Sequence, residues 1–224
     1  MNRVLDTLIN FFKKDEHILV DMTDRLYICD MRRKVDRDQI IEKGLELMCT
    51  TGYEATGVKE IADATGMLKG SFYNYFSSKE EFATVLLETY SDRTYALTKE
   101  ILSDTSTTPV VRLKNLFAKM WSSMNPPKEE FKGCFLGNFS QEIGNTNESL
   151  SSTVNQALVR IKKLYVECLK EAQAAGELDS SQDPDLMAEF IINSWQGVLL
   201  RVKSAKNFTA FESFKDQIFN RLLK

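Results

Sequence analysis

A short run of polar and basic side chains near residue 70 could contact the base edges and phosphates of DNA. The run reads Lys69-Gly70-Ser71-Phe72-Tyr73-Asn74. Helical spacing across residues 68–76 predicts that the apolar positions face inward, namely Leu68, Phe72, Tyr75 and Phe76. The remaining positions then face outward: Lys69, Gly70, Ser71, Tyr73 and Asn74. Their ammonium, hydroxyl and amide groups are of the kinds that hydrogen-bond base edges and phosphate oxygens.

Cys134 is the second candidate for chemistry. It follows Gly133 and opens a short predicted helix that ends near Gly144, so we expect free backbone N–H groups around its sulfur. Such a setting lowers the pKa of a thiol and favours attack on electrophiles such as quinones or aldehydes. Cysteine is also a common small apolar core residue, and the sequence leaves both interpretations open.

Other reactive side chains are too sparse for a metal site or a nucleophile–base pair. His17 is the only histidine, and the cysteines lie far apart without C-x-x-C spacing: Cys29, Cys49, Cys134 and Cys168. Without paired carboxylates, a nucleophile–base set or a phosphate-binding loop, we expect no enzyme, no catalytic residues, no metal and no cofactor. Dispersed cysteines without a secretory signal favour a reduced, cytoplasmic protein. No apolar run is long enough to span a membrane.

Two short helices joined by a glycine turn must position the polar run. The first is predicted at residues 58–64, with Val58, Ile61 and Ala62 on one face. Gly66 can take the left-handed conformation that ends a helix. A preceding helix is expected from Asp36 to Gly52. Three helices arranged in this way lay the last one in the major groove of DNA.

The chain from residue 36 to residue 82 resembles the DNA-binding half of the tetracycline-repressor (TetR) family. The resemblance rests on Gly-Tyr-x-x-Thr-x-Val-x-x-Ile-Ala-x-x-x-Gly from Gly52 and on Lys-Gly-Ser-Phe-Tyr-x-Tyr-Phe-x-x-Lys from Lys69. Leu68 departs from the pattern, because the family usually has a small polar residue there that would cap the helix. We predict that DNA is bound by Thr56, Gly57, Val58, Lys59, Lys69, Gly70, Ser71, Tyr73, Asn74 and Lys79, with Thr56, Lys59 and Lys79 on phosphates.

Net charge argues against a non-specific nucleic-acid binder, because the chain carries −3 with a pI near 5.4. The distribution of charge along the chain is uneven. Basic residues gather before and within the helix-turn-helix: Arg32, Arg33, Lys34, Arg37, Lys59, Lys69 and Lys79. A small basic surface on an acidic body suits a dimer whose two heads contact phosphates.

The rest of the chain reads as a series of amphipathic helices. They are expected at residues 78–103, from Pro109 to a break at Pro126-Pro127, at 133–144, from the cap cluster 145–147 to Gly176, at 184–203 and from Asn207. No strand alternation of useful length is present. The sequence therefore predicts an all-α protein: a three-helix helix-turn-helix head at 35–80, and a multi-helix ligand-binding and dimerisation body at 81–224.

Aromatic and methionine side chains of the middle helices could line a ligand cavity. The candidates are Phe117, Met120, Trp121, Cys134, Phe135, Phe139, Tyr165 and Trp195. Ordinary core packing explains the same residues equally well. The run Gly-Cys-Phe-Leu-Gly-Asn from Gly133 also resembles one in a subset of the family that includes some sensors of reactive electrophiles.

Wide apolar stripes on the last two helices indicate burial against a second copy. The family resemblance implies the same, with these helices pairing with their twofold mates. The predicted interface residues are Met187, Phe190, Ile191, Val198, Leu199, Phe211, Phe214 and Ile218. The alternative is that these side chains form the core of one protomer.

Residues 1–34 form an N-terminal extension of uncertain role. An apolar helical stripe from Val4 to Phe12 would suit an interfacial membrane helix or packing on the head, and Met31 is an alternative start. From the whole sequence we expect a cytoplasmic, homodimeric DNA-binding transcriptional regulator without a membrane segment. It would be a repressor released from double-stranded operator DNA by a small apolar, aromatic or electrophilic effector. The alternatives are an enzyme, or a protein-binding module built on the same head.

Overall fold

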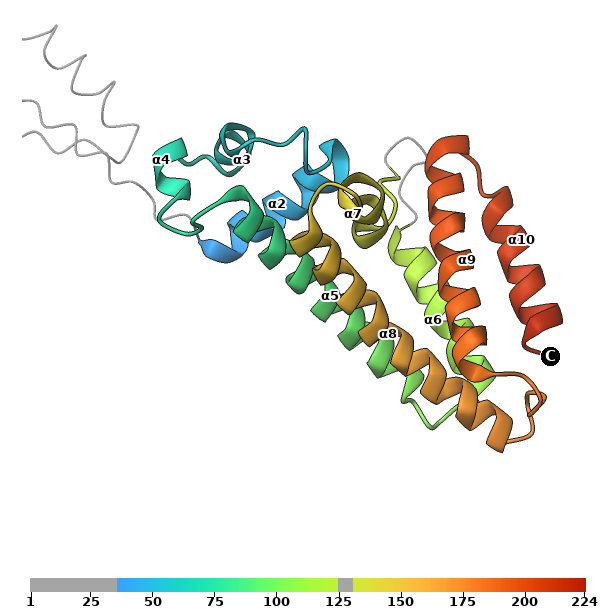
Figure 1. The fold of residues 1–224 in the computed structure, drawn as a ribbon. Helices are drawn as coiled ribbons and strands as arrows, with labels where there is room; N and C mark the ends of the chain where they lie inside the picture. The colour runs from blue at the N-terminus through green and yellow to red at the C-terminus, as the bar shows by residue number, and fades with distance from the viewer. Residues whose placement is uncertain (1–35, 125–130) are drawn as a thin grey trace, which may run out of the picture. The chain divides into compact units, whose positions relative to one another are not determined.

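The computed structural model describes residues 36–124 and 131–224, and Figure 1 shows its helices. No residue in these two ranges belongs to a β-strand, so the predicted all-α class is confirmed. The predictions for residues 1–34, and the break at Pro126-Pro127, lie outside them. No described helix has the length and apolar character needed to cross a membrane.

The head consists of α2 (Arg37–Thr51), α3 (Val58–Thr65) and α4 (Lys69–Phe72). Gly52 and Gly66 end the first two helices with φ angles of +86° and +70°, a region that glycine enters without steric cost. The predicted helix over residues 68–76 is wrong in length, because only its first turn is regular. Leu68 offers no side-chain cap, and the chain continues from Phe72 to Phe76 in tight turns.

Phenylalanine rings hold this short segment in place. Phe72 and Phe76 are fully buried and pack against Phe82 of α5, with ring centroids 5.5 and 4.7 Å from its ring. The expectation that Leu68 faces inward is wrong, since its side chain is 57% exposed. Aromatic rings therefore anchor the α4 segment, while its start projects into solvent.

Two long helices join the head to the body. α5 (Lys79–Leu102) begins at Ser78, whose hydroxyl accepts a hydrogen bond from the Glu81 N–H. The Glu81 carboxylate accepts hydrogen bonds from the backbone N–H and the hydroxyl of Ser77. α8 (Glu148–Ala174) packs along α5, as Figure 1 shows. α5 is continuous from the head into the body.

The remaining helices complete the body. They are α6 (Pro109–Met124), α7 (Phe135–Ile143), α9 (Pro184–Ala205) and α10 (Thr209–Gln217), which continues into a π-helical turn (Ile218–Leu222). Buried Arg112 ties three of the body helices together at the end of α5. Its guanidinium donates to the Leu102 carbonyl at 3.0 Å and to the Glu171 carboxylate of α8 at 2.5 Å. The carbonyl and the carboxylate together stabilise the positive charge of the Arg112 side chain, which would be costly to bury without partners.

Candidate functional site

The outer face of the α4 segment is open to solvent. Lys69, Gly70 and Asn74 are exposed, and Tyr73 is 52% exposed although its ring touches Phe72 edge-on. Ser71 is half-buried. No atom lies within 4 Å of the position that a Cβ on Gly70 would take. A nucleic-acid backbone can therefore approach the main chain closely at Gly70.

The predicted DNA-binding residues before and at the start of α3 are either accessible to solvent or engaged within the turn. Lys59 is exposed, and Val58 is half-buried. Thr56 is 1% exposed, and its hydroxyl lies 2.5 Å from the Gly52 carbonyl and 2.6 Å from the Thr51 hydroxyl. The Gly57 N–H donates to the Glu60 carboxylate at 3.0 Å. Thr56 thus holds the turn before α3 rather than presenting its side chain to a phosphate.

Lys79 is also engaged within the head. Its ammonium donates to the Tyr53 carbonyl at 3.0 Å and lies 4.0 Å from the centroid of the Tyr53 ring. Sequence reasoning placed this lysine on a DNA phosphate because it lies at the start of a predicted helix. The structure gives it a second role in fixing the turn between α2 and α3.

Glu142, near the end of α7, binds the same turn from the body. Its carboxylate accepts hydrogen bonds from the backbone N–H groups of Tyr53 at 2.8 Å and Glu54 at 2.7 Å. A Cβ on Gly52 would stand 2.8 Å from both carboxylate oxygens, so glycine is needed for this approach. The rings of Tyr53 and Phe139 meet with centroids 5.8 Å apart. Sequence reasoning missed Glu142, because no local pattern marks a contact across 89 residues.

A cavity of about 640 Å³ lies between the head helix α2 and the body helices. Five of the predicted ligand-binding residues line it: Met120, Cys134, Phe135, Tyr165 and Trp195. Phe117, Trp121 and Phe139 are not among the lining residues. Phe117 packs on Phe214 with centroids 5.0 Å apart, and Trp121 stacks on Phe211 at 3.8 Å. These rings join α6 to α10 because they project from the side of α6 that faces the C-terminal helices.

Several lining residues were not predicted. α5 contributes Tyr90, Arg93, Thr94, Leu97 and Thr98, α8 contributes Leu158 and Ile161, and α2 contributes Glu42, Lys43, Leu45, Glu46 and Cys49. The apolar stripe of α5 was visible in the sequence, but its partner across the cavity was not.

The charged lining residues form pairs. Arg93 donates to Glu42 through both Nη atoms and lowers the pKa of that carboxyl, and Lys43 lies 3.1 Å from Glu46.

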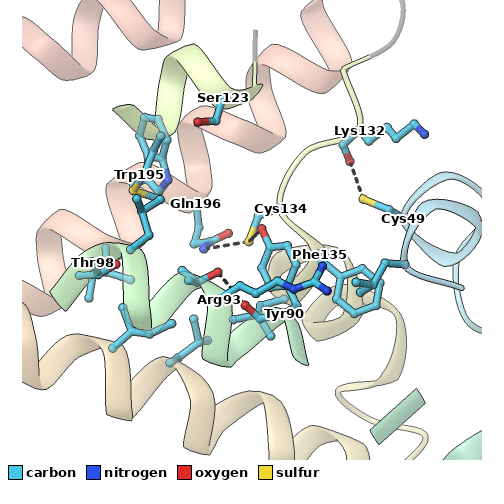
Figure 2. A pocket seen from close by; sticks show the side chains of 18 of the residues that line it. Cys49, Tyr90, Arg93, Thr98, Ser123, Lys132, Cys134, Phe135, Trp195 and Gln196 are labelled. Atoms are coloured by element: carbon cyan, nitrogen blue, oxygen red, sulfur yellow. Dashed lines mark hydrogen bonds between the residues drawn. The ribbon is translucent and has the colours of Figure 1, made fainter. Parts of the chain in front are cut away.

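Cys134 lies at the start of α7, inside the cavity wall. The expectation that N–H groups of the helix surround its sulfur is wrong, because its side chain makes no capping hydrogen bond. Its Sγ accepts from the Gln196 amide at 3.5 Å and from the Tyr90 hydroxyl at 3.8 Å, and Figure 2 shows the three side chains together. Cys49 of α2 donates to the Lys132 carbonyl at 3.9 Å. Burial raises the pKa of the Cys49 thiol and of the Tyr90 hydroxyl.

The predicted dimer residues are mostly core. Seven are buried within the protomer: Met187, Ile191, Val198, Leu199, Phe211, Phe214 and Ile218. Their burial follows from the packing of α9 on α8 and α10. Phe190 alone among the predicted set is exposed, at 56%, and it shares one exposed face of α9 with Leu186 and Leu200. The described residues contain no group of histidine, cysteine and acidic side chains that could hold a metal ion.

Two family models match the chain. Residues 40–85 match "Bacterial regulatory proteins, tetR family", and residues 109–218 match "Tetracyclin repressor-like, C-terminal domain". The chain is 38% identical to the HTH-type transcriptional repressor DhaR of Mycobacterium sp. (strain GP1), over 86% of this chain and 95% of that protein. It is 35% identical to the transcriptional regulator AcuR of Cereibacter sphaeroides, over 73% of this chain and 74% of that protein. A crystal structure of regulatory protein TetR from Rhodobacter sphaeroides superposes with a TM-score of 0.77 at 31% identity, over 82% of this chain and 96% of that one.

Proposed function

The chain belongs to the tetracycline-repressor (TetR) family of bacterial transcriptional regulators, and we propose that it is a homodimeric repressor that an apolar small molecule releases from operator DNA. The resemblance carried by residues 36–82 is thereby confirmed, and the protein is a DNA-binding regulator. The family consists of regulators rather than enzymes. We also propose that the protein is cytoplasmic, because a bacterial regulator acts on operator DNA in the cytoplasm.

The exposed face of α4 is the surface that we propose enters the major groove. Lys69 projects from this helix and Tyr73 and Asn74 from the turn that follows it, and Gly70 leaves room for a phosphate to approach the main chain. Lys59, exposed at the start of α3, would bind the flanking phosphates. Thr56 and Lys79 would act indirectly, by holding the turns from which these residues project.

Two heads are needed for a palindromic operator, and proteins of this family form dimers. The surface that we propose for the dimer is the exposed face of α9 with Leu186, Phe190 and Leu200. Gly197 lies on the same face, since it falls seven residues after Phe190, and its Cβ position is open. A glycine at the centre of an apolar helix face lets a partner helix pack closely.

The observation that carries the proposal is that the cavity is lined by both the head and the body. α2 of the head forms one wall, while α7 enters the cavity with Cys134, Phe135 and Leu136 and ends near Glu142, which holds the head turn. A ligand that fills the cavity therefore acts on two supports of the head at once. A shift of either changes the spacing of the paired heads, and half-sites about 34–36 Å apart tolerate little change.

Filling the cavity by mutation tests this proposal without knowledge of the ligand. Leu158 lines the cavity, and the next residue, Val159, is exposed and does not. We expect Leu158→Trp to weaken binding to the DNA upstream of the protein's own gene in a shift assay across a salt series, and Val159→Trp to bind as the wild type does. Wild-type binding should weaken as salt rises. Equal binding by the two variants, with helicity retained, would refute the release mechanism, and no wild-type shift at low salt would refute operator binding at this region.

A further inference from the structure

The inner part of the cavity is lined by neutral polar and apolar groups. Its charged lining residues are Glu42, Lys43, Glu46, Arg93 and Lys132. Each of these has a side chain at least 40% exposed and is paired with another of the set. They therefore lie at the open end. The inner polar groups are the hydroxyls of Tyr90, Thr94, Thr98 and Tyr165, the Cys134 thiol, the Gln196 amide and the Trp195 indole.

The indole nitrogen of Trp195 is a buried donor without a partner. Trp195 is 3% exposed and lines the cavity, and its Nε1 has no hydrogen-bond partner among the residues that the structure describes. The neighbouring rings of Phe117 and Phe214, with centroids 5.2 and 5.5 Å away, offer no acceptor of hydrogen-bonding strength. Buried donors are partnered in the great majority of native proteins, because an unmade bond costs free energy.

Some of the neighbouring polar groups are already engaged. Gln196 gives its amide hydrogen to Cys134, and Thr94 donates to the Tyr90 carbonyl at 2.9 Å. Figure 2 shows Trp195 and Gln196 from α9 facing the same space as Tyr90 and Cys134. Trp195 borders this space, although its Nε1 atom itself has almost no accessible surface, so an acceptor reaches that donor only when a bordering side chain shifts.

We propose that the effector carries a neutral hydrogen-bond acceptor, such as a ketone or ester carbonyl oxygen, that binds Nε1 of Trp195. The apolar remainder of the molecule would lie against Leu97, Leu158 and Ile161. This inference rests on the proposed function, since it assigns the chemistry of the ligand that the cavity takes. A neutral donor suits a carbonyl, whereas a carboxylate would lose its hydration among apolar side chains without a compensating cation.

The charge state of the lining supports a neutral acceptor. Burial raises the pKa of the hydroxyls of Tyr90 and Tyr165 and that of the Cys49 thiol. These groups are therefore uncharged at neutral pH. The lining cations Lys43, Arg93 and Lys132 are exposed or half-exposed, and each pairs with a carboxylate of α2.

Three probes built on the diphenylmethane framework test the proposal. The central carbon is a carbonyl in benzophenone, a CH2 group in diphenylmethane, and carries a carboxylate substituent in diphenylacetate. We expect benzophenone to bind the purified protein about tenfold more tightly than diphenylmethane, the effect of one buried hydrogen bond, and diphenylacetate to bind most weakly. The protein has two tryptophans, so its ¹H–¹⁵N spectrum reports each indole N–H directly. On binding, benzophenone should move the Trp195 indole signal downfield, and diphenylmethane should not.

Two variants complete the design. Trp195→Phe removes the donor and should abolish the preference for the ketone. Trp121→Phe is the matched control, because Trp121 stacks on Phe211 and does not line the cavity, and it should keep the preference. The wild-type comparison of probes stands even if Trp195→Phe does not fold.

Equal affinity of benzophenone and diphenylmethane for the wild type would overturn the proposal, as would tightest binding of diphenylacetate. DNA release is measured separately with the same probes. If a probe releases the DNA but benzophenone binds no more tightly than diphenylmethane, this inference is overturned and the proposed function stands. If benzophenone binds more tightly but no probe releases the DNA, the result supports a hydrogen-bond acceptor in the ligand and counts against DNA release through this cavity.

Discussion

The carboxylate of Glu142 accepts a hydrogen bond from the backbone N–H of Tyr53, 2.8 Å away, and so joins the end of α7 to the turn that precedes α3. The same carboxylate binds the N–H of Glu54 at 2.7 Å. Hydrogen bonds to charged groups contribute about 1.5–3 kcal/mol when they are well formed. Because α7 starts at the cavity, this contact connects the proposed ligand site with the DNA-binding head.

We expect Glu142→Ala to uncouple the cavity from the head. In the wild-type background Leu158→Trp should weaken operator binding, whereas in the Glu142→Ala background the same substitution should have a clearly smaller effect. A double-mutant cycle on operator Kd measures this difference, with an expected coupling of about 1 kcal/mol. Gln141→Ala is the control, since Gln141 is exposed on the same helix and its amide donates to the Gly137 carbonyl of its own turn. Additive effects in the Glu142→Ala background would remove α7 from the mechanism.

Tyr73 should contribute directly to DNA recognition. Its side chain is half-exposed directly after α4, while the adjacent Phe72 is buried and packs in the head. We expect Tyr73→Ala to weaken specific operator binding by about 1–3 kcal/mol with unchanged circular dichroism. Tyr73→Phe separates the hydroxyl from the ring. Full operator affinity in the alanine variant would move the recognition surface away from this position.

Phe190→Glu should produce a folded monomer. The residue is exposed within the protomer, so a charge there leaves the protomer fold intact and destabilises only a contact with a second copy. Sedimentation at micromolar concentration should give monomers with native helicity, and operator binding should fall. Val111→Glu, at another exposed apolar position on α6, should remain dimeric. A Phe190→Glu dimer would place the interface elsewhere. Leu199→Glu or Ile218→Glu cannot make this distinction, because both positions are protomer core where a charge would unfold the chain.

Release by quinones should not require Cys134. Its sulfur is buried and accepts bonds from Gln196 and Tyr90, an arrangement that suits packing and reversible ligand contact. We therefore expect Cys134→Ser to release operator DNA at the same concentration of methyl-1,4-benzoquinone as the wild type. Resistance of this variant, together with a quinone adduct on wild-type Cys134 in mass spectrometry, would identify the cysteine as a covalent sensor.

The sequence predicted local structure well where one residue decides it. Gly66 and Gly52 mark the ends of helices, and Asn147 of the predicted cap cluster caps α8, because each of these features depends on nearest neighbours. The length of α4 was not predictable in the same way. A stripe of four apolar residues fits a helix, but without a cap at Leu68 the tertiary packing of Phe72 and Phe76 sets the backbone.

The candidate sites were harder to predict, because each combines helices that are distant in the chain. Apolar periodicity identified the buried face of α9 but could not tell whether α10 or a second copy covers it. Buried Leu199 and exposed Phe190 were therefore assigned to the same interface. The cavity likewise depends on α2 facing α5 and α9, and Glu142 reaches the head through a contact that no spacing rule marks.

Selection of bound DNA from a random duplex pool tests the central claim most directly. The recovered sequences should contain two copies of one short motif in inverted orientation, with centres about one helical turn or a multiple of it apart. Sedimentation of the purified protein with a recovered duplex should give an even number of protomers per site. Phe190→Glu should fail to enrich the motif. No enrichment over the starting pool by the wild-type protein at low salt would contradict the account.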